Sequence, residues 1–122
     1  MKTFKCHKSL MKVIEKYIAT DDDKGDCGHC PFSMVFFKVA FPESKYNQQY
    51  QDLVDNKSYS GCAARAFLLN RYYGTNFSIF GKGPTFLLKK YKYNVGCNGD
   101  SDFQKQHDLR TMKFIPARNM KI

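Results

Sequence analysis

The sequence predicts a single α+β domain in which about three helices pack on a small mixed or antiparallel sheet, with a zinc site stabilising the fold. Three observations carry this prediction: apolar residues recur with helical spacing in three segments, a near-continuous apolar run follows a close pair of cysteines, and no segment marks a domain boundary. With 122 residues and 43% hydrophobic content, the chain is long enough to bury a core without disulfide bonds. We therefore treat 1–122 as one domain, with 116–122 as a loose tail.

The first predicted helix begins at Ser9, a residue type that often caps helices, and ends near Thr20. The acidic run at 21–23 would oppose the negative end of the helix dipole, which favours an end before it. The apolar residues of this helix are spaced three or four apart, as in an amphipathic helix packed on a core. They are Leu10, Val13, Ile14, Tyr17 and Ile18.

Two further helices are predicted in the middle of the chain. A polar helix begins at Ser44 and carries apolar residues at helical spacing. Another helix covers 62–73, opened by Ser60 or Gly61 and closed by Gly74, a residue type common just past a helix end.

The strands are predicted from apolar runs and from proline. Met34–Phe41 is the strongest candidate, since its near-continuous apolar character is typical of a central strand and Pro42 ends it. Phe77–Phe80 and Thr111–Ile115 are shorter candidates, and 85–95 is interpreted as a helical turn followed by a strand.

The candidate metal site starts from Cys27 and Cys30, the only close cysteine pair in the chain. Two cysteines separated by two residues place both sulfurs on one side of a tight turn, which is half of a tetrahedral zinc site. The other half would come from Cys62 and either Cys97 or His107. A second close pair, which would make a strong zinc signature, does not occur, so an iron–sulfur cluster and ordinary free thiols stay as alternatives.

The segment 27–30 reads Cys-Gly-His-Cys, which is also the dithiol sequence of disulfide isomerases. In that thioredoxin-like context, the pair follows a strand and opens a helix. Here a predicted helix precedes the pair, a predicted strand follows it, and Asp26 stands where those enzymes carry an aromatic residue. The context therefore argues against thiol–disulfide chemistry.

The net charge of +9 is concentrated in one segment. Residues 56–99, the acid-free stretch, hold seven Lys or Arg residues and no Asp or Glu. At the average acidic content of the chain, 11 of 122 residues, about four acids would be expected there. A solvated basic face would explain part of this pattern, but the complete lack of acids favours attraction to a polyanion.

The favoured function is non-catalytic binding of nucleic acid, with single-stranded DNA or RNA preferred. The acid-free stretch interleaves basic residues with nine aromatic ones, and lysines neutralise phosphates while exposed tyrosines stack on bases. We expect Arg65 and Arg71 to lie off the core on their helix. The residues predicted to contact nucleic acid or another partner are Arg65, Arg71, Tyr72, Lys82, Lys89, Lys90, Tyr91, Lys92 and Tyr93.

Two other classes of function stay open. A small basic inhibitor or adapter, of the kind that phages and viruses encode, could instead dock on a nucleic-acid-handling protein. A thiol- or metal-dependent enzyme is the third class, although no set of catalytic residues converges in the sequence. The N-terminal segment lacks the apolar run of a signal peptide and no stretch is long enough for a membrane span, so we expect a cytoplasmic protein.

Overall fold

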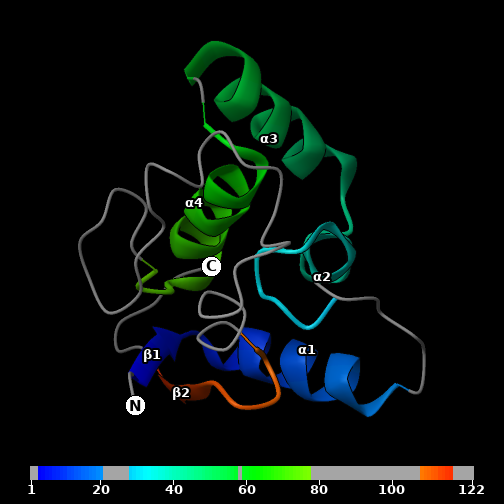
Figure 1. Ribbon diagram of the computed structural model, residues 1–122, viewed down its shortest axis with the longest axis vertical. Coiled ribbons are helices and arrows are strands. Elements are labelled where there is room, and N and C mark those ends of the chain that lie inside the picture. Colours follow the sequence, from blue (N-terminus) through cyan, green and yellow to red (C-terminus); the bar gives the residue numbers. More distant parts are fainter. Residues whose placement is uncertain (1–2, 21–27, 58, 78–107, 117–122) are drawn as a thin grey trace.

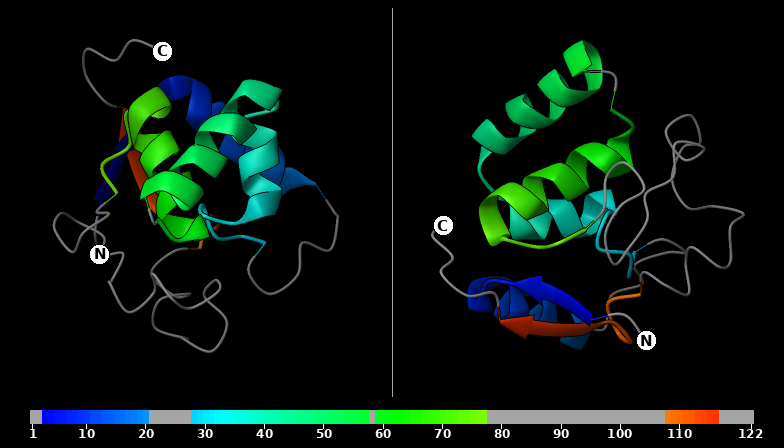
Figure 2. Two further views of the ribbon diagram at one scale, coloured as in Figure 1. Left: turned by 90° about the horizontal axis from the view of Figure 1, so that it is seen from above. Right: turned by 90° about the vertical axis from the view of Figure 1, so that its left-hand side faces the viewer.

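The computed structural model describes residues 3–20, 28–57, 59–77 and 108–116, which form a small α+β fold (Figure 1). These residues contain four helices and a two-stranded sheet. The elements, in chain order, are β1 (Thr3–Cys6), α1 (Lys8–Ala19), α2 (Met34–Ala40), α3 (Ser44–Lys57), α4 (Gly61–Tyr73) and β2 (Lys113–Pro116). Figure 2 shows two layers: α1 and the sheet form one, and α2, α3 and α4 form the other.

The sheet joins the first and last described segments of the chain. β1 and β2 run parallel, with Phe4 opposite Phe114 and Cys6 opposite Pro116. We expected a mixed or antiparallel sheet, so the parallel pairing of these two strands is a correction. β2 agrees with the predicted C-terminal strand but begins at Lys113, two residues later than expected, and no strand was expected at β1.

Helix α1 forms as its apolar spacing predicts, and Leu10, Ile14 and Tyr17 are buried. The residue that caps it is His7 and not Ser9, because the His7 Nδ1 atom accepts a hydrogen bond from the Ser9 backbone N–H at 3.1 Å. The ring thus satisfies one of the backbone donors that the first helical turn leaves free.

The segment predicted as the central strand is the helix α2, which is the main correction to the expected fold. Ser33 caps this helix, and its Oγ atom accepts a hydrogen bond from the Phe36 N–H at 3.1 Å. Phe36, Phe37 and Ala40 are buried, whereas Met34, Val35 and Val39 are exposed. Burial therefore follows the 3.6-residue period of a helix and not the two-residue period of a strand.

Helices α3 and α4 confirm the other two helical predictions. Ser60 caps α4 through a 3.1 Å hydrogen bond from the Ala63 N–H, and Gly74 ends it with a left-handed φ of 65°. Ala64 and Ala66 are fully buried, which lets neighbouring elements approach α4 closely. α3 packs along α4, and the two helices frame the candidate site.

An aromatic cluster joins the two layers. The Phe32 ring is fully buried and meets the Phe77 ring edge-on at 4.8 Å between centroids. Phe77 in turn contacts Phe4 of β1 at 5.4 Å, and Phe4 contacts Phe114 of β2 at 5.9 Å. The loop after the cysteine pair is therefore packed into the core.

Several predicted features lie outside the described residues. They are residues 78–80 of the predicted strand at Phe77–Phe80, the segment 85–95, and residues 117–122 of the predicted tail. Within the described ranges, no helix is both long enough and apolar enough to span a membrane.

Candidate functional site

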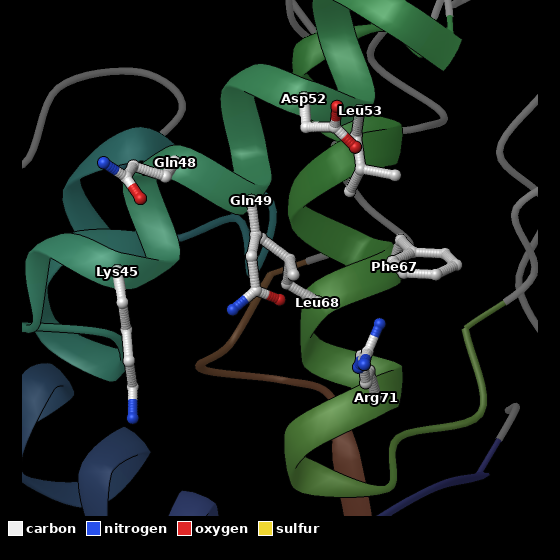
Figure 3. Close-up of a pocket in the computed structure, with 8 residues that line it drawn as sticks. All are labelled: Lys45, Gln48, Gln49, Asp52, Leu53, Phe67, Leu68 and Arg71. Carbon is white, nitrogen blue, oxygen red and sulfur yellow. The ribbon is translucent and has the colours of Figure 1, made fainter.

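A groove between α3 and α4 is the candidate binding site, with a cavity of about 400 Å³ (Figure 3). Side chains from both helices line it. They are Lys45, Gln48, Gln49, Asp52 and Leu53 from α3, and Phe67, Leu68 and Arg71 from α4. This volume falls in the lower part of the range of small-ligand sites, about 300–1,000 Å³.

Helical periodicity places the polar residues of α3 along the groove. Lys45, Gln48, Gln49 and Asp52 follow one another at intervals of three, one and three residues, so they lie on one face of the helix. Leu53 and Leu68 are buried and give the groove an apolar base. The groove therefore combines an apolar base with a polar rim.

Three charged side chains line the groove, two from α3 and one from α4. Figure 3 shows Lys45 on α3 and Arg71 on α4 at different sides of the groove, with Asp52 further along α3. The Lys45 Nζ atom is 3.5 Å from Glu43 Oε2, but both side chains are more than half exposed, so this ion pair is weak. Arg71 is exposed and forms no ion pair with any residue in the described parts of the chain.

Tyr72 fixes the geometry beside Arg71. Its hydroxyl donates a 2.7 Å hydrogen bond to Gln49 Oε1, and its ring meets the Tyr46 ring edge-on at 5.1 Å. The Arg71 guanidinium carbon lies 5.5 Å from the centroid of the Tyr72 ring. Tyr72 is thus half-buried and tied to α3, and its ring lies beside the Arg71 guanidinium.

Arg65 has a different role from the one we expected, because its side chain is only 8% exposed. Its Nε atom donates to the Phe32 carbonyl oxygen, one Nη atom donates to the Tyr50 hydroxyl at 3.1 Å, and the other lies 3.8 Å from the Cys62 Sγ atom. A Cβ atom at Gly61 would lie 2.9 Å from the Tyr50 hydroxyl, so glycine makes room for this contact. The prediction that Arg65 lies off the core was wrong, since the residue connects α3, α4 and the loop at Phe32.

The remaining residues of the predicted interface lie outside the described ranges. They are Lys82, Lys89, Lys90, Tyr91, Lys92 and Tyr93. Of the predicted residues that the structure describes, Arg71 and Tyr72 lie together at the groove and Arg65 lies in the core. The α3 side chains were missed, although the polar residues of that helix recur at helical spacing in the sequence.

The predicted metal ligands are only partly described. Cys27, Cys97 and His107 lie outside the described residues, whereas Cys30 is buried and Cys62 is half-buried on α4. The Phe32 N–H donates to Cys30 Sγ at 3.5 Å, and the His29 carbonyl accepts from the Leu109 N–H at 2.7 Å. Within the described ranges, no three His, Cys, Asp or Glu side chains come together as a metal site, so zinc binding stays a prediction.

The neighbourhood of the cysteine pair differs from that of a thioredoxin-like site in two ways. The element before the pair is the helix α1, and α2 begins at Met34 with Ser33 as its cap, after Cys30. A helix, and not the expected strand, follows the pair, but Cys30 does not open it. The isomerase interpretation therefore stays unsupported by the local geometry.

The buried thiol of Cys6 has the environment of a structural residue. Its side chain is fully buried in β1, and burial raises the pKa of this thiol to about 12. The thiol therefore keeps its proton at neutral pH, which makes it unreactive.

Comparisons with known proteins give no relative for this chain. No protein-family model, no curated protein and no solved structure matches it at a significant level.

Proposed function

We propose that the protein binds single-stranded nucleic acid without catalysis, through a surface that includes the acid-free stretch. The observation that carries this proposal is the exposed Arg71, which forms no ion pair with any described residue and lies beside Tyr72 at one end of the α3–α4 groove. A free guanidinium at the mouth of a groove is suited to a phosphate group, which it can hold with two parallel hydrogen bonds.

The sequence around this site strengthens the electrostatic argument. The acid-free stretch supplies seven positive charges and no negative one, and Arg71 is one of the seven. Each phosphate neutralised by Lys or Arg releases condensed counterions, so the affinity for nucleic acid should fall as salt rises. The four lysines of the predicted interface, Lys82, Lys89, Lys90 and Lys92, would extend the same surface.

The test measures the anisotropy of labelled single-stranded oligonucleotides of several sequences with the full chain. Replacing Lys89, Lys90 and Lys92 with Ala should weaken binding nearly uniformly across the sequences, because phosphate contacts carry no base information. The salt slope should become shallower by up to about one unit per lost contact. Tyr91→Ala should cost about 1–3 kcal/mol with little change in slope if that ring stacks on a base. A wild-type chain that binds no oligonucleotide at low salt would overturn the proposal.

The exposed face of α2 supports a second candidate, an adapter or inhibitor that docks on a nucleic-acid-handling protein. Met34 and Val35 are each 49% exposed and Val39 is 46% exposed, so three apolar side chains lie on one face of this helix. Docking through such a face should persist at high salt, whereas direct binding to nucleic acid should not. A Val35→Asp variant that keeps its oligonucleotide affinity but loses a protein partner would favour the adapter.

We also propose a structural zinc ion held by Cys27, Cys30 and Cys62, with Cys97 or His107 as the fourth ligand. Cys30 supports this proposal, because its sulfur already accepts a backbone hydrogen bond of the kind that orients metal ligands.

A further inference from the structure

We infer that the outer edge of β2 is a docking site for an extended acidic segment of a partner protein, which would join the sheet as a third strand. This inference is independent of the proposed binding of nucleic acid, because it concerns the sheet and not the groove. It is carried by the unequal cover of the two sheet edges, by the direction of the backbone groups of β2 and by the charges beside them.

The two edges of the sheet differ in what covers them. On the β1 side, the Lys5 N–H donates a 2.9 Å hydrogen bond to Asn76 Oδ1, and the His7 N–H, just past the strand, donates one of 2.8 Å to the Tyr73 carbonyl. The segment after α4 therefore covers this edge. On the other side, no described residue outside β1 hydrogen-bonds to β2, which lies at the periphery of the molecule (Figure 1 and Figure 2). An open strand edge of this kind is a template for pairing with another chain.

The register shows which backbone groups of β2 point to the open edge. Because the Lys5 N–H points away from β2, the backbone groups of Phe4, one residue earlier, point towards it. In a parallel pair, such a residue bonds to the two neighbours of the residue opposite it. Phe114 is opposite Phe4, so its own N–H and C=O point outward, whereas the N–H of Ile115 points to β1. Pro116 adds an outward carbonyl and has no N–H.

The side chains beside this edge favour an acidic partner. Lys5, Lys113 and Ile115 are exposed on the outer face of the sheet, and neither lysine forms an ion pair with a residue in the described ranges. In an antiparallel third strand, an acidic residue opposite Lys113 and a β-branched residue opposite Ile115 would stabilise the pairing. On the inner face, an aromatic residue opposite the half-buried Phe114 would cover the rest of its ring.

A second copy of this chain fits the edge less well than an acidic segment. Each copy carries a net charge of +9, and lysine on an edge strand discourages the pairing of identical edges. Two β2 strands paired around Phe114 would bring both Lys113 side chains onto the same outer face of the joined sheet. An acidic partner would instead neutralise Lys113, so charge complementarity favours a different protein over self-association.

The experiment titrates the full chain with a capped peptide, Thr-Val-Tyr-Glu-Thr, and follows the backbone amides by NMR chemical shift and hydrogen exchange. In an antiparallel strand, its valine, tyrosine and glutamate would lie opposite Ile115, Phe114 and Lys113. In the free protein, the Phe114 N–H should exchange about tenfold faster than the Ile115 N–H after correction for intrinsic rates, because only Ile115 donates towards β1. Saturating peptide should slow exchange of the Phe114 N–H by about tenfold.

Two altered peptides and a pair of protein variants isolate the backbone pairing and the charge. Methylation of the tyrosine nitrogen removes the N–H that would donate to the Phe114 carbonyl, and should weaken binding by about tenfold. Replacing the glutamate of the peptide with lysine should weaken binding to the wild type by about fivefold. Lys113→Glu should reverse this preference. Lys57→Glu, the same charge change on an exposed residue of α3 in the other layer, should keep it.

Four results would overturn the inference. The first is a Phe114 amide that exchanges as slowly as the Ile115 amide in the free protein. The second is a wild type that binds neither the glutamate nor the lysine peptide, or binds both equally, and the third is an N-methylated peptide that binds as well as its parent. The fourth is a dimer, detected by sedimentation, whose formation protects the Phe114 amide without any peptide, since β2 would then pair with a second copy.

Discussion

Arg65 and Arg71 lie six residues apart on α4, but replacing Arg65 with Met should destabilise the fold and replacing Arg71 with Met should hardly change its stability. Arg65 is buried, and its guanidinium donates hydrogen bonds to the Phe32 carbonyl and the Tyr50 hydroxyl. A hydrogen bond from a charged donor contributes about 1.5–3 kcal/mol, and leaving the buried Phe32 carbonyl unsatisfied costs about 1–3 kcal/mol. Removing a buried charge that has no carboxylate partner among the described residues offsets part of this loss.

We therefore expect Arg65→Met to lower the free energy of unfolding by about 2–4 kcal/mol. Arg71→Met is the matched control. The same change at this exposed position on the same helix should alter the free energy of unfolding by less than about 0.5 kcal/mol. Urea unfolding followed by circular dichroism measures both values. Equal stabilities of the two variants would refute the reasoning that Arg65 links α4 to the core.

Three further predictions concern α2, a buried thiol and the metal. Phe36→Ala should lower the free energy of unfolding by about 3–5 kcal/mol, whereas Val35→Ala should lower it by less than about 0.5 kcal/mol. Equal losses for the two variants in urea unfolding would contradict the helical burial pattern. Cys6, whose thiol pKa is raised to about 12, should resist alkylation at pH 8 in the folded protein, as mass spectrometry can check. Above pH 9 the Cys6 thiol keeps its proton in the folded state and loses it in the unfolded state. The free energy of unfolding should therefore fall by at most about 1.4 kcal/mol per pH unit as the pH rises from 9 towards 12. Elemental analysis should find about one zinc per chain, and both chelation and Cys27→Ser should lower the melting temperature; metal-free protein that melts unchanged with chelator would exclude the site.

The helices with strong local signals could be predicted from the sequence. α1 carries an apolar stripe at helical spacing, and α4 lies between a serine cap and a glycine at the left-handed C-terminal position. These signals lie within a few residues of each other, so no knowledge of the tertiary structure was needed to detect them.

The error at α2 has a local cause. Residues 34–41 are rich in β-branched and aromatic side chains, and a short apolar run of this kind fits a buried helix as well as a strand. The signal that distinguishes the two was Ser33, whose side chain caps the helix by accepting from the Phe36 N–H. The helix also buries one face against α1, through contacts such as Tyr17 with Phe36. The cap and this packing together outweigh the β propensity of the segment.

The sheet and the groove depend on contacts that are distant in the sequence. β1 pairs with β2 across more than 100 residues, and nothing in Thr3–Cys6 alone indicates a parallel partner. The position of Arg65 is similar, because its helical spacing leaves open whether the side chain faces water or the Phe32 carbonyl. Arg71 could be predicted as an exposed cation, but the α3 residues that complete its groove could not.

The most direct test of the proposed function is the salt dependence of binding to a labelled single-stranded oligonucleotide, compared between the wild type and Arg71→Gln. Lys12→Gln, an equal loss of charge on the exposed face of α1, serves as the control. If Arg71 contacts a phosphate, the wild-type affinity falls steeply with salt, and Arg71→Gln binds more weakly with a slope shallower by about 0.7. A wild type that does not bind at low salt, or an Arg71→Gln slope equal to those of the wild type and the control, would contradict the account.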